Sequence, residues 1–402
     1  MTSKYLLPAA LLVAAGPAWA EEIVLKPVGE ARLRYETVDQ DGIARDADAL
    51  TMRVRGGLSA TSGRWSATAQ AQGTLATVED YHDGLNGTAD RPLIADPETI
   101  ALYLAQLQYK AHALTLTAGR QAIALDDERF VGPVGFRQNG QSFDALRAEI
   151  TPAQGLKADI SYVWSVRTIW GIDGTGARQQ AISGDNVLAN LSYRTPLGTL
   201  TGFAYLVDQG EAAVQGFRLS SQTYGARLAG AQALSGTVKL SYQASYARQT
   251  DYRRNPNDYR ADYYLVDGSL DIAALRVNGG YEVLGADSGT ALTSFQTPLA
   301  TLFKFNGWAD KFLTTPANGL RDLYGGAGYG FRKVGPIDLL SFQAVYHRFD
   351  SDRLDQHYGN EIDLLASAKI GRTLVSARYA DYDAKRFATD TTKLWLSIDV
   401  AL

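Results

Sequence analysis

The sequence predicts an all-β protein: a transmembrane antiparallel β-barrel of about 18 strands, with long extracellular loops partly folded into the lumen. Three observations predict this fold. Apolar and polar residues alternate with period two along the chain, the alternating segments are about ten residues long, and the connections between them are short and long in turn. Tilted strands of that length span a bilayer, and short turns on one side with long loops on the other are typical of outer-membrane barrels.

The first residues predict export. Lys4 is followed by an apolar run over residues 5–15 and by Ala18, Trp19 and Ala20, which is the pattern of a secretory signal peptide cleaved after Ala20. The apolar run is shorter than the roughly 20 residues that a spanning helix needs. We therefore expect a signal peptide over residues 1–20 and a single outer-membrane β-barrel domain over residues 21–402, located in the outer membrane of a Gram-negative cell.

The strand pattern begins near residue 29, where Leu33 and Tyr35 face one way and Arg32 and Arg34 face the other. Strands are expected near positions 29, 50, 64, 100, 113, 142, 155, 186, 198, 219, 235, 258, 271, 319, 336, 358, 373 and 391. An even count places both chain ends on one side. The short connections then lie in the periplasm and the long ones, such as residues 122–141 and 287–317, lie outside the cell.

The charged residues of the strands follow the parity opposite to the apolar ones, so we expect them to line the lumen. The inward cations are Arg32, Arg34, Arg53, Arg55, Lys110, Arg147, Lys157, Arg167, Arg194, Arg227, Lys239, Arg260, Arg276 and Arg378. The inward acids are Glu30, Glu36, Glu149, Asp159, Asp262, Glu282, Glu361 and Asp363. An arginine-rich lumen favours anions. The alternative is that inward arginines and acids pair across neighbouring strands and only stiffen the wall.

Arg120 does not fit this rule. Leu114, Leu116 and Ala118 face lipid, so strict parity turns Arg120 outward as well. Either Gly119 begins a bulge, or Arg120 lies above the hydrocarbon zone.

The loop that follows carries charges of both signs among several glycines, and loops of this kind line functional sites. We expect this loop to fold into the lumen. Asp126, Asp127 and Glu128 would then anchor it to arginines of the wall, and Arg129 and Arg137 would join the inward arginines and face a passing anion.

Catalytic and metal chemistry find little support in the sequence. Cysteine is absent, there are four histidines, and none of them lies in a metal-binding motif. His347 has inward parity and is interpreted as a hydrogen-bonded wall residue; an outer-membrane lipid enzyme would need a serine beside it. Removing Lys4 with the signal peptide leaves 39 minus 1, or 38, basic residues against 43 acidic ones, which excludes a nucleic-acid partner. We expect no cofactor and no metal.

Four stretches of the chain resemble the alginate export porin family of Gram-negative outer membranes: GRQAIALDDERFVGPVGFRQNGQSFDA at 119–145, FNGWADKFLTTPANGLRDLY at 305–324, GNEIDL at 359–364 and YADYDAKRFATDTTKLWL at 379–396. The resemblance implies a monomeric 18-stranded barrel that passes an anionic polysaccharide through an arginine-rich constriction. It implies pore or plug contacts for the matching residues, which are Arg120, Arg129, Arg137 and Asp144 in the first stretch and Trp308, Asp310 and Lys311 in the second.

The function we expect is a passive outer-membrane channel, and not an enzyme, for anionic sugars, uronates or polysaccharide. Its partners would be outer-membrane lipid and an anionic saccharide or small organic acid. The expected pore constriction and substrate path consist of Arg120, Arg129, Arg137, Arg147, Arg32, Arg34, Arg53, Arg55, Arg167 and Arg194. The expected loop anchors are Asp126, Asp127, Glu128 and Asp144. The alternatives are an uptake porin for other small organic acids, a plugged structural or adhesion barrel, and an outer-membrane lipid enzyme.

Overall fold

The computed structural model describes residues 22–401, so the expected signal peptide lies outside the described residues. The chain forms 18 strands: β1 (Val24–Gln40), β2 (Ala47–Ser62), β3 (Trp65–Asp80), β4 (Thr99–Lys110), β5 (Leu114–Gln121), β6 (Ser142–Ala153), β7 (Leu156–Arg167), β8 (Ala181–Thr195), β9 (Gly198–Val207), β10 (Ser221–Ala233), β11 (Val238–Asp251), β12 (Arg260–Ile272), β13 (Leu275–Leu284), β14 (Leu320–Val334), β15 (Ile337–Asp350), β16 (His357–Ile370), β17 (Thr373–Ala384) and β18 (Thr391–Ala401). Two short 3-10 helices, η1 (Gln215–Phe217) and η2 (Leu302–Lys304), lie in loops.

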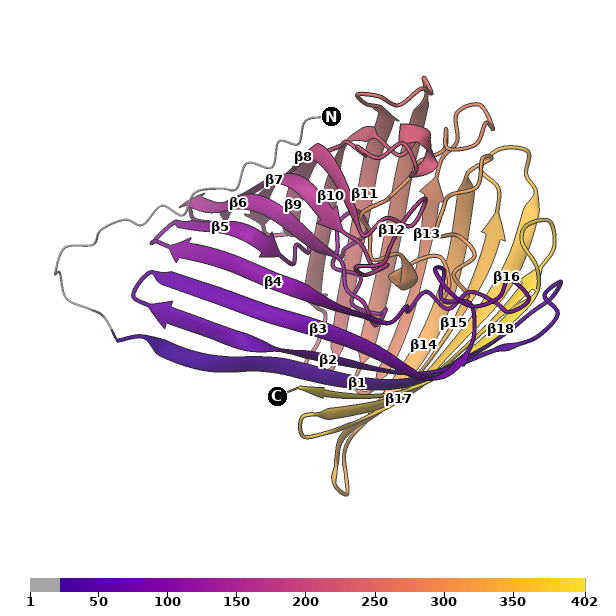
Figure 1. Ribbon diagram of the computed structural model, residues 1–402, viewed down its shortest axis with the longest axis horizontal. Helices are drawn as coiled ribbons and strands as arrows, with labels where there is room; N and C mark the ends of the chain where they lie inside the picture. The colour runs from indigo at the N-terminus through magenta and orange to yellow at the C-terminus, as the bar shows by residue number, and fades with distance from the viewer. Residues whose placement is uncertain (1–21, 402) are drawn as a thin grey trace.

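The strands form one closed antiparallel barrel (Figure 1). Each strand pairs with the next along the chain, and β1 pairs with β18 as well as with β2. The closing register runs from Glu30 opposite Ala401 to Gln40 opposite Thr391. The predicted fold class and the predicted number of strands are therefore confirmed.

Burial along the strands alternates as the sequence pattern predicts. On β1 the side chain of Leu33 is 43% exposed, whereas that of Arg34 is 1% exposed. On β18 Leu396 is 47% exposed and its neighbour Trp395 is fully buried. A closed barrel with an apolar outer face satisfies every ladder hydrogen bond and meets lipid with hydrocarbon, which is how strands cross a bilayer.

The connections differ in length between the two ends of the barrel. Residues 63–64, 335–336 and 371–372 are tight turns at the end that holds both termini of the barrel, which is periplasmic in proteins of this kind. The opposite end carries long loops, above all residues 122–141 and 285–319. None of the helices within residues 22–401 is long and apolar enough to cross a membrane.

Candidate functional site

Two extracellular loops, residues 122–141 and 285–319, pack against each other and are called the plug loops below. Val131 and Leu299 form a parallel bridge between them, and the Gly132 amide donates to the Leu299 carbonyl at 2.9 Å. The rings of Phe136 and Phe303 are stacked across the same contact. The two loops therefore behave as one packed unit.

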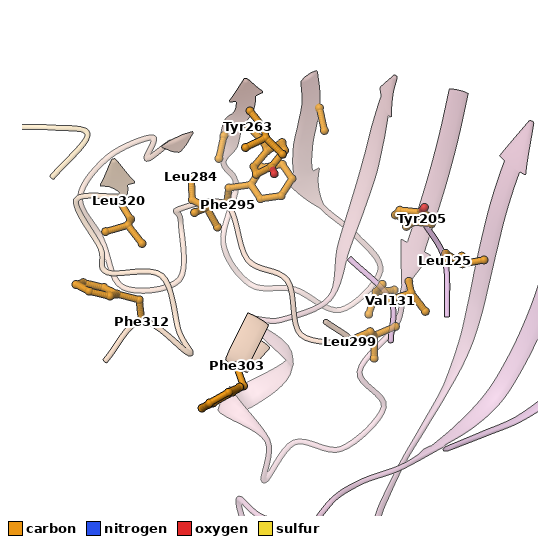
Figure 2. Close-up of a cluster of buried hydrophobic side chains, with 14 of the residues drawn as sticks. Leu125, Val131, Tyr205, Tyr263, Leu284, Phe295, Leu299, Phe303, Phe312 and Leu320 are labelled. Carbon is orange, nitrogen blue, oxygen red and sulfur yellow. The ribbon is translucent and has the colours of Figure 1, made fainter. Parts of the chain in front are cut away.

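An apolar core fixes the plug loops inside the barrel (Figure 2). The Phe130 ring centroid lies 5.1 Å from that of Phe203 on β9 and 5.2 Å from that of Tyr263 on β12. Phe295 of the other plug loop packs on Tyr263 at 5.3 Å. Because the strand residues in this core point inward, the loops occupy the lumen. The prediction that long extracellular loops fold partly into the lumen is therefore confirmed.

This core corrects the expected positions of Arg260 and Asp262. On β12 the residues that point inward are Ala261, Tyr263 and Leu265, which are 2%, 0% and 5% exposed. Arg260 and Asp262 consequently face outward, near the extracellular end of the strand. The parity rule failed here because the apolar face of this strand meets the plug loops instead of lipid.

Arg129 is buried, and it holds the first plug loop to the wall. Its Nε donates to Glu282 Oε1 of β13 at 2.6 Å, and its remaining nitrogens donate to Thr297 Oγ1 at 3.2 Å and Asn306 Oδ1 at 3.1 Å. The side chain is 2% exposed. The expectation that Arg129 faces a passing anion is therefore wrong, since the residue is fully used as an anchor.

Arg137 joins the two plug loops. Its Nη2 donates to Asp310 Oδ2, and its Nη1 lies 3.6 Å from Glu36 Oε2 on β1. The residue is only 6% exposed. It lines the outer cavity described below, but two carboxylates already compensate its charge.

The arginines of β1 and β2 bind the main chain of the first plug loop. Arg34 Nη2 and Arg32 Nη1 donate to the Phe136 carbonyl at 2.6 and 2.8 Å, and Arg53 Nη1 donates to the Arg137 carbonyl at 3.3 Å. The ladder that the sequence predicts thus exists, and much of its hydrogen-bonding capacity holds the loop.

The three acids at the start of the loop have separate partners. Asp127 Oδ1 lies 2.8 Å from Arg227 Nη1 on β10, as a loop anchor would. Asp126 accepts from Asn190 Nδ2 on β8 at 2.9 Å. Glu128 instead pairs with Lys304 of the second plug loop at 2.9 Å. Only Asp127 therefore forms an ion pair with a wall arginine.

The second loop motif docks on acids of β16. The Ala309 amide donates to Glu361 Oε1 at 2.7 Å, and the Trp308 amide donates to Asp363 Oδ2 at 3.3 Å. Lys311 Nζ donates to Gln40 Oε1 of β1 at 3.2 Å. The motif residues Trp308, Asp310 and Lys311 thus lie together inside the barrel.

Arg120, Asp144 and Arg167 form a cluster on the outer face. Arg120 donates to both Asp144 oxygens, at 2.7 and 3.0 Å, and Arg167 Nε donates to Asp144 Oδ2 at 3.3 Å. The pairing of β5 runs unshifted through Gly119, so Arg120 does face outward. Of the two explanations offered for Arg120, the bulge at Gly119 is excluded.

A bulge does occur one strand further on and turns Arg167 outward. The register between β7 and its neighbours shifts between Val163 and Ser165, so that Val166 is buried and Arg167 follows it on the other face. The expectation that Arg167 lines the lumen is wrong for this reason. Asp144 anchors this rim cluster and not the plug loops.

Among the predicted inward arginines, Arg147 lies on β6 and Arg194 on β8, whereas Arg53 and Arg55 lie on β2. Arg147 Nη2 lies 2.6 Å from Asp159 Oδ2 on the inner face of β6 and β7, and Arg194 is exposed near the periplasmic end of β8. Near β1, Arg53 and Arg55 share Glu30 at 2.8 Å each.

Arg378 of β17 differs from the other ladder arginines. Among residues 22–401 it has no carboxylate within ion-pair distance. Its guanidinium instead lies 5.6 Å from the Phe136 ring centroid and 5.8 Å from that of Trp308, which are residues of the plug loops. An unneutralised cation therefore stands at the inner wall beside the plug.

Two cavities adjoin the plug loops. The outer one, of about 430 Å³, is lined by loops at the extracellular end and contains Arg137, Lys311 and Lys393 with one acid, Asp310. The inner one, of about 240 Å³, lies against β11 to β16 and contains Glu282, Asp322, Asp363, His347 and Lys304. The outer cavity is basic and the inner one is acidic.

Three charged residues that line the two cavities, Lys393, Asp322 and Lys304, were not predicted from the sequence, although the period-two alternation indicates two of them. Lys393 has the parity of the buried Trp395 and Ser397, and Asp322 has that of the buried Leu320. Period two therefore places Lys393 and Asp322 inside the barrel. Lys304 lies in a loop and carried no such signal.

Closed 18-stranded topology, an apolar outer face and a polar interior define a transmembrane β-barrel of the outer-membrane type. No family model matches the sequence, and no curated protein matches it. The fold is similar to that of solved structures. Pseudomonas aeruginosa OpdQ is 17% identical over 94% of this chain and 98% of its own, with a TM-score of 0.69.

Two further solved structures are similar over comparable lengths. Acinetobacter baumannii OccAB4 is 14% identical over 96% of this chain and 100% of its own, with a TM-score of 0.70. Pseudomonas aeruginosa OccK9 (OpdG) is 14% identical over 94% of this chain and 98% of its own, also with a TM-score of 0.70. At such identities the similarity shows the fold. It supports an outer-membrane barrel and not the alginate export family in particular.

Proposed function

We propose that the protein is a passive outer-membrane channel for small organic acids, among them uronates and other anionic monosaccharides. The observation that carries this proposal is the arginine ladder of β1, β2 and β17 beside the plug loops. Its members are Arg32, Arg34, Arg53, Arg55 and Arg378, and the carboxylates that contact them are Asp399, Asp96 and Glu30. Five cations against three anions leave an excess of two positive charges, and such a fixed field favours anions.

The size of the space around the plug favours small acids over a polymer. The plug loops are held by the Arg129–Glu282 pair at β13 and by the ladder arginines at β1, so they contact the wall on both sides. A cavity of about 430 Å³ is in the range of sites that hold one small molecule. Passage of a polysaccharide would require the loss of these buried contacts. A small cargo is therefore favoured over a polymer. Because the sequence resembles alginate export porins, we propose uronate monomers as one class of cargo.

The lumen and both plug loops belong to one chain, and for this reason we propose that the channel acts as a monomer. No hydrolytic step is part of the proposal. His347 Nδ1 bonds Asp322 at 2.9 Å and its Nε2 lies 3.7 Å from Asp363, so that both ring nitrogens face carboxylates and neither is placed to activate a serine.

Liposome swelling tests the proposal. Proteoliposomes are diluted into isosmotic solutions of glucuronate, gluconate or the uncharged sugar glucose, and the rate of swelling is followed by light scattering. We expect the two acids to enter faster than glucose, and the difference to fall in Arg378→Gln. Arg248→Gln is the matched control, because Arg248 pairs with Asp262 on the outer face. Entry of glucose at the same rate as the acids, or no entry of any solute, would contradict the proposal; the second result would favour a plugged barrel.

A further inference from the structure

The outer cavity lies between extracellular loops and is separate from the arginine ladder. Its walls come from the plug loops, from the loops at residues 81–98, 168–180 and 208–220, and from the extracellular ends of β1, β7, β8 and β18. Most of the lining side chains are apolar, and they include Val166, Trp170, Ile182, Leu299, Phe303 and Leu313. A ligand in this cavity would therefore bury hydrocarbon on most of its surface.

The charged residues of the cavity are confined to one corner. Arg137 donates to Asp310, Lys393 Nζ lies 3.7 Å from the same carboxylate, and Lys311 follows Asp310 in the chain. Arg137 also lies 3.6 Å from Glu36 Oε2, so that two carboxylates match its charge, and Lys393 shares Asp310 with it. Two of the three cations in this corner therefore contact carboxylates.

Lys311 is the residue whose charge is not matched. Its Nζ donates to the neutral amide oxygen of Gln40 at 3.2 Å, and no carboxylate within residues 22–401 lies at ion-pair distance from it. A partly buried ammonium without an anion is costly, so the site favours a ligand that supplies one.

The electrostatic surroundings of Lys311 agree with this geometry. Burial, together with the ammonium of Lys393, lowers the pKa of Lys311 to about 8, while Glu361 and Asp310 act in the opposite direction. An anion bound at Nζ would favour the charged form and raise that pKa again.

We propose that the outer cavity binds an organic monoanion with an apolar body, its carboxylate on the ammonium of Lys311 and its hydrocarbon against Leu299, Phe303 and Leu313. The site would capture such an acid at the extracellular end before it reaches the ladder, and in that sense the inference rests on the proposed function. This site gives a binding role to residues of the second plug loop, none of which belongs to the arginine ladder.

Equilibrium binding to the intact protein in detergent tests the site without transport. Phenylacetate is titrated by calorimetry, with glucuronate as the acid of polar body and benzyl alcohol as the uncharged probe. We expect phenylacetate to bind best, and Lys311→Met to weaken it about 10-fold, the typical effect of losing one charged hydrogen bond. Leu313→Asn should weaken phenylacetate and leave glucuronate unchanged. Lys333→Met is the matched control, since Lys333 is exposed beside a periplasmic turn.

Binding should also fall as the pH rises through about 8, because the ammonium of Lys311 is lost there. Lys311→Met should abolish this pH dependence, whereas a structural defect would not. Equal affinity in Lys311→Met and the wild type, or equal affinity for phenylacetate and glucuronate, would overturn the inference. Loss of anion-selective transport with binding intact would refute the channel function alone, and absence of binding with selective transport would refute the site alone.

Discussion

Arg129 and Glu282 are 153 residues apart in the chain and form a fully buried ion pair, with Nε 2.6 Å from Oε1. The pair joins the loop after β5 to the wall at β13. Asn306 of the other plug loop contacts both residues, since its Oδ1 accepts from Arg129 and its Nδ2 donates to Glu282 Oε2 at 2.6 Å. Both plug loops therefore share one anchor on the barrel wall.

Loss of this anchor should open the plug. Arg129→Met leaves Glu282 buried without a cation, which costs about 3 to 5 kcal/mol in comparable buried pairs. We expect the docked position of the plug loops to be lost at that cost, while the barrel ladders stay formed. Single-channel recording should show a larger and noisier conductance, and protease should cleave within residues 122–141.

The double variant Arg129→Met with Glu282→Leu serves as the control for that result, because it removes both charges and leaves apolar groups in their place. It should recover most of the wild-type conductance. A single variant that gates like the wild type would show that the pair does not hold the plug.

The acids at the start of the first plug loop should contribute less. Asp127 is about a quarter exposed in its pair with Arg227, so water screens this pair more than the buried Arg129–Glu282 pair. Replacing Asp126, Asp127 and Glu128 together by their amides should raise gating noise without changing the mean conductance. Noise and conductance both identical to the wild type would refute an anchoring role for these acids.

The outward position of Arg167 makes a further prediction. Because Arg167 bonds Asp144 on the outer rim, Arg167→Gln should leave ion selectivity unchanged. Arg147→Gln, by contrast, removes a cation that faces the lumen and leaves Asp159 with only Lys157, 3.9 Å away, so it should lower anion selectivity. Reversal potentials of the two variants give the comparison. An equal effect of both substitutions would contradict the assignment of faces.

The strands were predictable because lipid contact imposes period two on the sequence, as Leu33 and Arg34 illustrate. A β-bulge, which inserts one extra residue into a strand, was not predictable in the same way. One extra residue at the bulge between Val163 and Ser165 reversed the parity of Arg167, and nothing in the alternation signals that insertion. On β12 the rule failed because Tyr263 packs on Phe130 inside the lumen, so an apolar face no longer identifies the lipid side.

The charges of the plug were predicted, but their roles were not. The sequence places Arg129 and Arg137 in a loop long enough to reach the lumen, but their acidic partners Glu282 and Asp310 lie far along the chain. Whether a loop arginine faces water or a buried carboxylate depends on contacts between residues that are far apart in the sequence. The local sequence pattern does not indicate such contacts.

The reversal potential in a KCl gradient across a planar bilayer tests most directly whether the intact protein prefers anions. We predict a potential of the sign that marks chloride as the more permeant ion. The selectivity should be reduced, without loss of conductance, when Arg32 and Arg378 are both replaced by glutamine. Equal permeability of potassium and chloride in the intact protein, or a preference for potassium, would contradict an anion-selective channel.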